Sequence, residues 1–371
     1  MKIAILGGHV TPALKVLEHF PKGMDAVYIG RKFALEGDSA YSLEYQALHA
    51  RGIPFFNLTT GRLQRTFTLH TIPSLIKLPQ GFWQSFRLLR EIKPDVILGF
   101  GGYLSVPVGI VGKLMGIPLI IHEQTLEAGL ANRMLTPFAD KICISWDTSR
   151  KFFPANKTTL TGNPAVTSIF EKTHPHRLKK GVLPHLVIVG GSLGSHAMNT
   201  LIEGCLEELL KHYEVLHQTG DAREFRDFDR LAQKRDSLGP ILRDRYTLIK
   251  FIDPNDIVSV FESADLVVTR AGINTVTTLL LLNKPALLIP LPTSQKNEQL
   301  KNAQFLKQHK LGEIFNQTTG TPEKLFTVIE TMVKQKNSYT NTGSQEELTI
   351  HKHSIQKIID TIIYVTKKTS E

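Results

Sequence analysis

Two glycine-rich turns in the second half of the chain have the residue types that bind phosphate groups. The first, Gly190–Ser195, follows a short apolar run and opens a helical pattern. The second, Ala271–Thr275, has the same setting, and Asn274 or Thr275 could cap the helix that follows. Glycine lets an anion approach bare backbone amides, and a helix N-terminus carries partial positive charge. Either turn alone could be an ordinary strand-to-helix connection, but the two together fit a diphosphate.

Titratable side chains occupy two comparable positions in the first half of the chain. His9 follows Gly7 and Gly8 at the end of the first apolar run, and imidazole titrates near neutral pH, as a general base must. His122-Glu123-Gln124 ends a later apolar run, where polar groups commonly face a ligand. We expect His9 to be the catalytic base and Glu123 to be the second candidate. The alternative is that both groups only support the site structurally.

One amphipathic stretch, residues 75–87, mixes large apolar side chains with lysine and arginine. Its apolar members are Leu75, Ile76, Leu78, Phe82, Trp83 and Phe86. Aromatic rings suit the bilayer interface and cations suit anionic headgroups, so this stretch is a candidate membrane patch. It could equally be an ordinary helix whose apolar face joins the core. The longest apolar segments, Val106–Ile121 and Thr278–Pro292, are interrupted by lysine and proline, so we expect no membrane-spanning helix.

Short apolar runs alternate with longer amphipathic stretches along the whole chain. The expected strands are Lys2–Leu6, Asp25–Ile29, Asp95–Leu98, Pro118–Ile121, Lys141–Ser145, His185–Val189, Glu214–His217, Leu248–Phe251, Asp265–Val268 and Ala286–Ile289. The expected helices are Pro12–Phe20, Leu75–Ile92, Asn199–His212, Thr321–Gln335 and Ile350–Val365, with a polar loop over residues 336–350. Nearly continuous apolar strands that alternate with helices predict parallel sheets covered on both faces.

The pattern of strand ends occurs twice, which predicts two Rossmann-like domains. Glycines end the first strand and a later strand in each half, at Gly7 and Gly101 and again at Gly190 and Gly272. In open α/β sheets ligands bind at the carboxyl ends of the strands. The joint between the domains is expected at Thr161–Pro164, where proline and glycine interrupt regular structure.

Composition narrows the function classes. The 371 residues suit two domains, and 42% apolar with 21% charged residues is ordinary globular usage. The net charge of +10 favours anionic partners, but the basic residues are dispersed and match no nucleic-acid-binding motif. Cys143 and Cys205 form neither a CxxC nor a zinc-ligand spacing, so we expect reduced thiols and no metal site.

Taken together, these segments resemble the MurG type of glycosyltransferase over nearly the whole chain. The matching segments are Gly7–Leu14, Thr60–Arg65, Lys93–Val96, Gly101–Pro107, Gly116–Gln124, Thr161–Pro164, Gly190–Gly194, His217–Gly220, Ala264–Gly272 and Gln299–Ala303. The family transfers N-acetylglucosamine from UDP-N-acetylglucosamine to an undecaprenyl-linked acceptor, lipid I, in peptidoglycan synthesis. The resemblance implies an inverting enzyme that needs no cofactor, lies peripherally on the anionic cytoplasmic face of the cell membrane and binds no nucleic acid.

The resemblance also implies the α/β GT-B fold, in which two Rossmann-like domains face each other across a cleft. The expected divisions are residues 1–163 for the acceptor, 164–345 for the UDP-sugar, and 346–371 as a terminal helix that packs back on the first domain. The implied donor-binding residues are Gly191, Ser192, Gly194, Ile252, Gly272, Asn274, Thr275, Thr278, Gln299 and Thr125. The implied acceptor-binding residues are Gly7, Gly8, Gly101, Gly102, Tyr103 and His122.

The chain departs from the family pattern at specific positions. Its first glycine loop is shorter, Thr278 stands where the family usually has a glutamate that holds the ribose, and Thr125 replaces an asparagine. These departures leave three alternatives open. They are another UDP-sugar-dependent lipid glycosyltransferase, a UDP-sugar 2-epimerase of the same fold, and a catalytically silent scaffold on the membrane surface.

Overall fold

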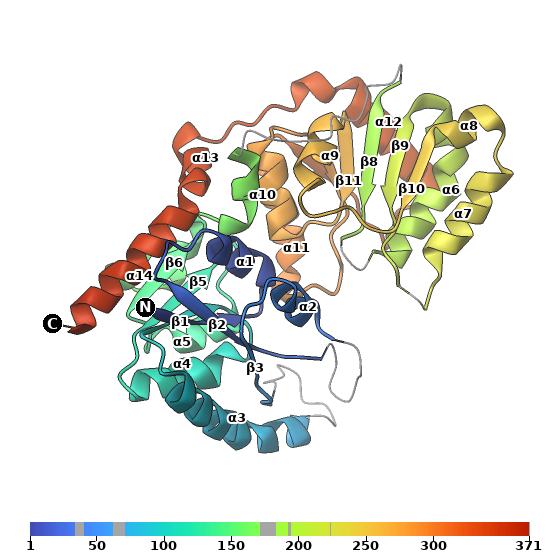
Figure 1. The fold of residues 1–371 in the computed structure, drawn as a ribbon. Coiled ribbons are helices and arrows are strands. Elements are labelled where there is room, and N and C mark those ends of the chain that lie inside the picture. The colour runs from blue at the N-terminus through green and yellow to red at the C-terminus, as the bar shows by residue number, and fades with distance from the viewer. Residues whose placement is uncertain (34–40, 62–70, 171–182, 192–193, 223, 371) are drawn as a thin grey trace. The chain divides into compact units, whose positions relative to one another are not determined.

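The computed structural model describes residues 1–33, 41–61, 71–170, 183–191, 194–222 and 224–370. They form two compact α/β units (Figure 1). Unit 1 contains Met1–Thr167 and Thr349–Glu371, and unit 2 contains Ser168–Leu348. The predicted joints, after Asn163 and after Gln345, lie a few residues before these boundaries.

Unit 1 is built on a seven-stranded sheet in the order β3-β2-β1-β4-β5-β6-β7, with every pair parallel. The strands are β1 (Lys2–Gly7), β2 (Asp25–Gly30), β3 (Phe55–Asn57), β4 (Val96–Phe100), β5 (Leu119–Glu123), β6 (Lys141–Ile144) and β7 (Thr158–Leu160). Side chains on both faces of the central strands are buried, which explains why these strands are apolar at nearly every position.

Helices cover both faces of this sheet. One face packs against α3 (Thr71–Ile92), α4 (Ser105–Leu114) and α5 (Leu130–Leu135). The other packs against α1 (Val10–Glu18), α2 (Leu43–His49) and the C-terminal α14 (Ser354–Ser370), whose isoleucines Ile355, Ile358, Ile359 and Ile362 repeat at helical spacing. The C-terminal helix is therefore part of the core of unit 1, and the short α13 (Gln345–Lys352) precedes it.

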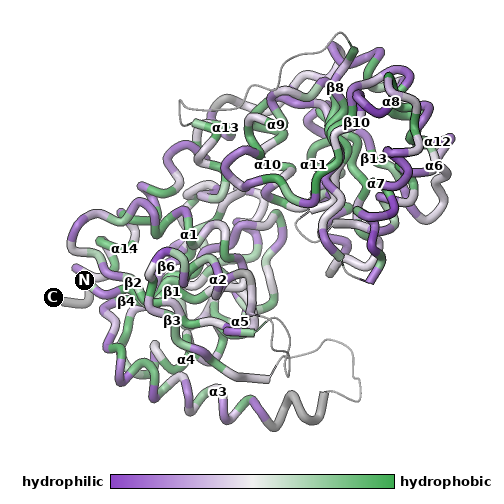
Figure 2. The backbone as a smooth tube through the Cα atoms, turned by 45° about the vertical axis from the view of Figure 1, so that its right-hand side comes forward, coloured by the Kyte–Doolittle hydropathy of each residue, from purple (hydrophilic) through white to green (hydrophobic). Residues whose placement is uncertain are grey.

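Unit 2 repeats this arrangement with six parallel strands in the order β10-β9-β8-β11-β12-β13. The strands are β8 (His185–Val189), β9 (Glu214–Gln218), β10 (Tyr246–Ile249), β11 (Leu266–Thr269), β12 (Ala286–Leu288) and β13 (Gly312–Ile314). The helices are α6 (His196–His212), α7 (Asp227–Ser237), α8 (Pro240–Asp244), α9 (Ile257–Ser263), α10 (Ile273–Leu281), α11 (Glu298–Gln308) and α12 (Pro322–Lys334). In each unit the hydrophobic residues concentrate on the strands (Figure 2).

The strand order of each sheet reverses direction at one place, which fixes where a ligand can bind. In unit 1 the chain runs outward from β1 to β3 and then returns to β4 beside β1, and in unit 2 it does the same at β8 and β11. In open α/β sheets, ligands bind outside the carboxyl ends of the strands at such a reversal. The glycine turns found in the sequence follow these four strands.

The sequence prediction of the elements is correct for the longer ones and incomplete for the short ones. Each of the ten expected strands overlaps an observed one, although Leu248–Phe251 is displaced by two residues from β10. The short strands β3, β7 and β13 were not predicted. The loop expected over residues 336–350 is wrong at its end, since α13 already begins at Gln345. Within the described part of the chain, no helix combines the length and the apolar character that crossing a membrane requires.

Candidate functional site

Two glycine turns of unit 1 touch each other backbone to backbone at the carboxyl edge of the sheet. A Cβ atom added to Gly8, which follows β1, would lie 2.6 Å from the Cα atom of Gly102, which follows β4. Gly101 and Gly102 have φ angles of +78° and +82°, which only glycine adopts without strain. The predicted acceptor-binding glycines Gly7, Gly8, Gly101 and Gly102 therefore form one connected backbone surface.

His9 stands exposed at the edge of this surface and precedes the first residue of α1. A Cβ atom on Gly101 would lie 3.9 Å from His9 Cδ2 and 3.7 Å from Asn132 Nδ2, so these three residues are neighbours. Although the side chain reaches solvent, neighbouring protein atoms desolvate the imidazole in part and lower its pKa below the ordinary value; the negative charge of Glu123 opposes this effect. His9 is therefore neutral at pH 7, the form in which it can accept a proton.

The Glu123 side chain is held in place by hydrogen bonds to both of its oxygen atoms. Its Oε1 atom accepts hydrogen bonds from the Thr125 backbone N–H at 3.0 Å and from the Thr125 hydroxyl at 2.6 Å. Its Oε2 atom accepts from the Gly129 N–H at 2.8 Å and from Asn132 Nδ2 at 2.9 Å. A carboxylate has about four acceptor positions, and these donors fill them. The acceptor positions of Glu123 are therefore already occupied by protein donors.

His122 and Tyr103 are also predicted to bind the acceptor; His122 is buried and Tyr103 is partly buried. The Nε2 atom of His122 donates to the Gly162 carbonyl at 3.2 Å, and burial lowers the pKa of this histidine to about 4. Tyr103 packs partly buried against the core below α4. His122 is thus a neutral structural link between β5 and the turn after β7, and its Nδ1 atom has no partner among the described residues.

In unit 2 the first glycine turn approaches a neighbouring backbone so closely that side chains are excluded. Gly194 has a φ angle of +77°, and a Cβ atom there would lie 1.8 Å from the Thr219 carbonyl oxygen. Gly191, with a φ angle of +86°, has no described atom within 4 Å of its added Cβ and is open to a ligand. Ser195 caps α6 by accepting from the Met198 N–H at 3.4 Å. Ser192, a predicted donor contact, lies outside the described residues.

Arg270 joins the two glycine turns of unit 2 and was not predicted as a site residue. It lies after β11, and its Nη2 atom donates to the hydroxyl of Ser195 at the start of α6. Its Nη1 atom donates to the Ile289 carbonyl at 2.8 Å. Burial lowers the pKa of the guanidinium, which nevertheless remains protonated at neutral pH. The sequence placed Arg270 beside a turn, but only the pairing of β8 with β11 shows that it reaches the other turn.

The second turn of unit 2 differs from the prediction in how its helix begins. Gly272 is the N-cap of α10, and as a glycine it makes no side-chain capping hydrogen bond. The expectation that Asn274 or Thr275 caps α10 is therefore wrong, since both lie in its first turn. The Thr278 hydroxyl donates to the Asn274 carbonyl at 2.9 Å and so bonds back to its own helix. The N-terminus of α10 carries the partial positive charge of any helix start.

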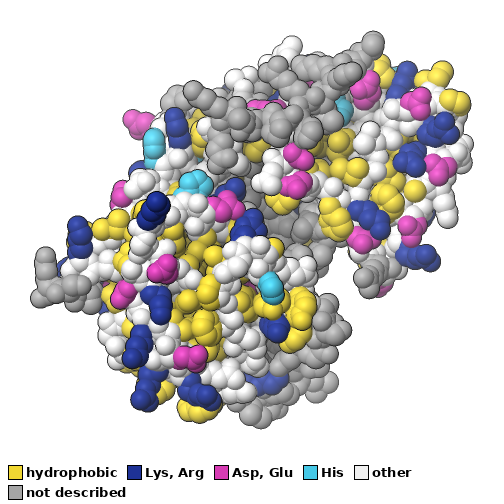
Figure 3. All heavy atoms as spheres, viewed as in Figure 1, with side chains coloured by type: hydrophobic (Ala, Val, Ile, Leu, Met, Phe, Trp, Pro, Cys, Tyr) yellow, Lys and Arg dark blue, Asp and Glu magenta, His cyan; other side chains and the backbone are white. Residues whose placement is uncertain are grey.

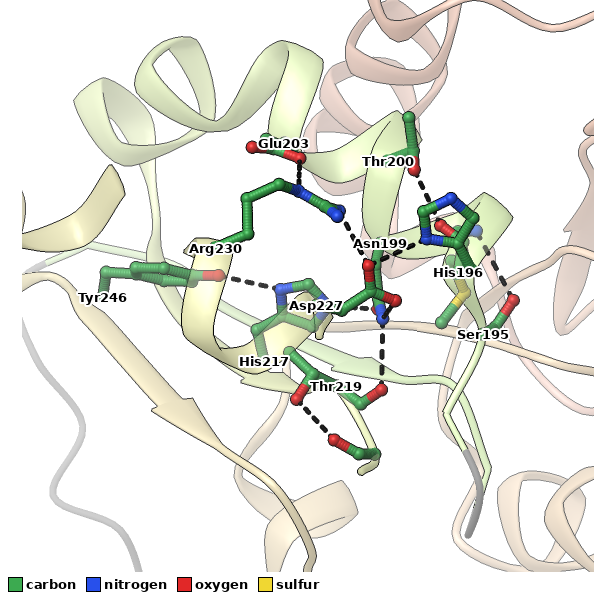
Figure 4. Close-up of polar contacts among 12 residues, drawn as sticks. Ser195, His196, Asn199, Thr200, Glu203, His217, Thr219, Asp227, Arg230 and Tyr246 are labelled. Carbon is green, nitrogen blue, oxygen red and sulfur yellow. Dashed lines mark hydrogen bonds and ion pairs between the residues drawn. The ribbon is translucent and has the colours of Figure 1, made fainter. Parts of the chain in front are cut away.

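A buried polar network holds α6 in place beneath the first turn (Figure 4). Asn199 is central: its Nδ2 atom donates to the Thr219 carbonyl at 3.1 Å and to Asp227 at 2.8 Å, and its Oδ1 atom accepts from His217 Nε2 at 3.1 Å. His217 Nδ1 then accepts from the Tyr246 hydroxyl at 2.9 Å. Burial lowers the pKa of His217 to about 3, so this ring is neutral. The network fixes α6 relative to β9 and β10, and the histidine at its centre carries no charge.

Three further predicted donor contacts lie at different places in the fold. Ile252 lies in the loop after β10, at the same edge of the unit 2 sheet as the turns. Gln299 lies in the first turn of α11, and its Oε1 atom accepts from the Leu291 N–H at 3.0 Å. Thr125 is buried in unit 1 and bonded to Glu123, so it acts there on the orientation of the carboxylate.

The predicted membrane patch divides within α3. Phe82 packs against the core of unit 1, whereas Trp83 is 58% exposed and Phe86 is 41% exposed. Arg87 lies 4.8 Å from the centre of the Trp83 ring, and Arg90 lies 5.9 Å from that of Phe86. Leu78 is half-buried, and the side chains of Leu75 and Ile76 lie outside the described residues. The exposed part of the patch is thus a pair of aromatic rings, each under an arginine.

Both halves of the chain match domains of one known protein family. Residues 7–144 match the glycosyltransferase family 28 N-terminal domain, and residues 185–362 match the glycosyltransferase family 28 C-terminal domain. A relative from Clostridium perfringens is 30% identical over 361 residues, which cover 96% of this chain and 94% of the relative. One from Clostridium botulinum is 29% identical over 348 residues, 92% of each chain. Both are named UDP-N-acetylglucosamine–N-acetylmuramyl-(pentapeptide) pyrophosphoryl-undecaprenol N-acetylglucosamine transferase.

Solved structures agree with this assignment. The crystal structure of MurG from Acinetobacter baumannii matches 98% of this chain and 100% of its own, with a TM-score of 0.69 and 25% sequence identity. The UDP-GlcNAc 2-epimerase of Methanocaldococcus jannaschii, with a TM-score of 0.62 and 14% identity, shares the fold alone. Both units thus have the Rossmann-like form of a GT-B enzyme. The chain belongs to glycosyltransferase family 28, within its MurG group, and is a UDP-GlcNAc-dependent glycosyltransferase.

Proposed function

We propose that this protein transfers N-acetylglucosamine from UDP-N-acetylglucosamine to the N-acetylmuramyl-pentapeptide of a pyrophosphoryl-undecaprenol carrier, with inversion at the anomeric carbon. The names of its clostridial relatives support these substrates. The observation that carries the proposal is the difference between the glycine turns of the two units. The turns of unit 1 lie beside a neutral histidine, His9, whereas those of unit 2 combine backbone amides with the guanidinium of Arg270.

Unit 2 is proposed to bind the donor. The backbone at Gly191, the N-terminus of α10 and the guanidinium of Arg270 supply positive partners that suit a diphosphate. Ile252 would meet the uracil through its backbone, and Gln299 would meet the sugar. Fixed dipoles and a permanent charge stabilise the leaving UDP without having to reorganise during the reaction.

Unit 1 is proposed to bind the acceptor and to move the proton. The acceptor hydroxyl oxygen forms a bond to the anomeric carbon while the bond from that carbon to the UDP oxygen breaks, and the electron pair of that bond leaves with UDP. The hydroxyl proton passes to the neutral imidazole of His9. The buried Glu123 carboxylate, whose charge already acts on His9, stabilises the imidazolium that forms.

The lipid-linked acceptor calls for a surface that reaches the bilayer, and we propose that Trp83 and Phe86 provide it at the cytoplasmic face. Aromatic rings with arginines above them suit the headgroup region of an anionic membrane. On the face drawn in Figure 3, lysines and arginines lie interspersed with acidic residues. Because the positive charge there is not concentrated in one patch, insertion of the rings has to contribute to membrane binding. Sedimentation with anionic vesicles tests this: Trp83→Ser should weaken binding, and equal binding would remove Trp83 from the membrane contact.

The transfer itself is tested by mixing purified protein with UDP-N-acetylglucosamine and a short-chain analogue of the lipid-linked acceptor, and by measuring UDP release. We expect release only when the acceptor is present. Formation of the 2-epimer from the donor alone would instead show an epimerase. Tight UDP binding with no transfer to any acceptor would show a silent scaffold, and either result would overturn the proposed function.

A further inference from the structure

Tyr28, in the middle of β2, carries a buried hydroxyl that has no partner among the described residues. The side chain is 0% exposed, and no hydrogen-bonding group of the described chain reaches its oxygen. A buried polar group without a partner costs stability, and phenylalanine would fill the same volume without that cost. The position therefore needs an explanation that packing does not supply.

The ring extends along the sheet to the glycine turn after β1. Tyr28 is paired with Ile5 in the register of the two strands, and Gly7 follows Ile5 on the same face. A Cβ atom added to Gly7 would lie 1.7 Å from the Tyr28 hydroxyl oxygen, and one added to Gly30 would lie 2.7 Å from the ring. Two glycines thus provide the space in which the hydroxyl reaches the carboxyl edge of the sheet.

Neighbouring rings hold Tyr28 in this position. It stacks on Phe55 with ring centres 5.6 Å apart and an interplanar angle of 17°. Phe55 in turn meets Tyr45 edge to face at 5.1 Å, and the Lys32 ammonium lies 5.2 Å from the centre of the Tyr45 ring. Burial and the charge of Glu44 raise the pKa of the Tyr28 hydroxyl, so it stays protonated and can donate a hydrogen bond.

The turn beside the hydroxyl has the features of an anion site. Gly8 and His9, which follow Gly7, are both exposed, so the turn opens to solvent next to the hydroxyl. The helix α1 starts at Val10, and the side chain of its N-cap residue, His9, makes no capping hydrogen bond. The first backbone amides of α1 carry partial positive charge and point toward the same turn.

We propose that Tyr28 is a further acceptor-binding residue, whose hydroxyl donates a hydrogen bond to an anionic phosphate oxygen held at the Gly7-Gly8-His9 turn. This inference rests on the proposed function, because the acceptor supplies the diphosphate. The hydroxyl supplements the few amides of this short turn with a neutral donor on a rigid ring, and a charged acceptor oxygen makes such a bond strong.

The variant Tyr28→Phe isolates the hydroxyl because it keeps the ring and its stacking. We expect the acceptor KM to rise about tenfold or more, as for the loss of one hydrogen bond to a charged group. The UDP Kd should stay unchanged, and the melting temperature should stay level or rise. Calorimetry with farnesyl diphosphate, a short prenyl diphosphate, gives a readout that needs no turnover, and its Kd should rise by a similar factor.

Tyr246→Phe is the matched control, since the Tyr246 hydroxyl bonds to His217 in unit 2. It should lower the melting temperature and leave the acceptor KM and the farnesyl diphosphate Kd unchanged. If Tyr28→Phe leaves both constants unchanged in an enzyme that transfers sugar, the inference on Tyr28 is wrong and the proposed function stands. If the wild type binds farnesyl diphosphate through Tyr28 but transfers no sugar, the proposed function fails and the phosphate contact stands.

Discussion

The sheets of the two units share one strand order, but the residues at their switch points differ in kind. In unit 1 the turns after β1 and β4 bring His9 beside the glycines, and Glu123 ends the next strand. In unit 2 the turns after β8 and β11 present bare amides and Arg270. The first set contains a neutral imidazole that can accept a proton, whereas the second keeps a constant positive character.

This difference shows how one scaffold supplies two roles. A diphosphate needs permanent positive partners, and amides and a guanidinium provide them at every physiological pH. An attacking hydroxyl needs a group that accepts a proton, and a neutral imidazole provides it. Changes in unit 1 should therefore act on turnover and on the acceptor, and changes in unit 2 should act on the donor.

The largest effect is expected from His9→Ala in unit 1. Loss of the base should lower kcat by about 100-fold or more, while the UDP Kd from calorimetry stays unchanged. The exposed His19, at the other end of α1, is the matched control, and His19→Ala should retain full turnover. Because burial lowers the pKa of His9, wild-type kcat should persist below pH 6.5 and fall only as the pH drops through that lowered value. An unchanged kcat in His9→Ala would remove this residue from the mechanism.

Arg270→Met tests the permanent charge of unit 2. Removing a guanidinium from the diphosphate pocket should raise the UDP Kd by about 10- to 100-fold, and the farnesyl diphosphate Kd should not change. Arg243→Met, at an exposed position on α8 in the same unit, controls for net charge. Equal losses of UDP affinity in the two variants would show that only long-range charge matters and would contradict the assignment of Arg270.

A smaller effect is expected from Gly272→Ala. This variant tests whether UDP binding requires a residue without a Cβ atom in the turn before α10. Gly272 and Gly239 are both N-caps with extended backbone, at φ −67° and −61°, and neither has a described atom within 4 Å of an added Cβ. Alanine should therefore cost each a similar free energy of unfolding, under about 1 kcal/mol. Only Gly272→Ala should raise the UDP Kd, by about 3- to 10-fold. If Gly239→Ala raised it equally, the proposed contact would be wrong.

Acid should destabilise the folded state of both units for the same reason, although their sites differ. Each contains a buried neutral histidine, His122 in unit 1 with a pKa of about 4 and His217 in unit 2 with a pKa of about 3. The unfolded chain takes up these protons near pH 6.5 and the folded chain does not, so the free energy of unfolding falls as the pH drops below 6.5. The expected slope is roughly 1.4 kcal/mol per pH unit for each histidine. Urea unfolding at pH 7.5 and 5.0 measures it, and His217→Gln should show a shallower dependence than the wild type. The same pH dependence in that variant would contradict a neutral His217.

Local sequence predicts part of this contrast, and spatial pairing determines the rest. The four glycine turns and His9 are visible because each lies at the end of an apolar run. The link from Arg270 to Ser195 depends on β11 lying beside β8, and Tyr28 reaches Gly7 only because β2 lies beside β1. The saturation of Glu123 by Gly129 and Asn132 likewise depends on how the loop folds back. Such contacts between distant segments leave no local period in a sequence.

The central claim is that the donor bound by unit 2 is transferred, with inversion, to an acceptor activated in unit 1. The most direct test is the proton NMR spectrum of the product formed by the wild-type protein from UDP-N-acetylglucosamine, which is α-linked, and a lipid-linked muramyl acceptor. The account predicts a disaccharide whose new glycosidic bond has the large anomeric coupling of a β-linkage. An α-linked disaccharide, or an unmodified acceptor from an enzyme that binds both substrates, would contradict it.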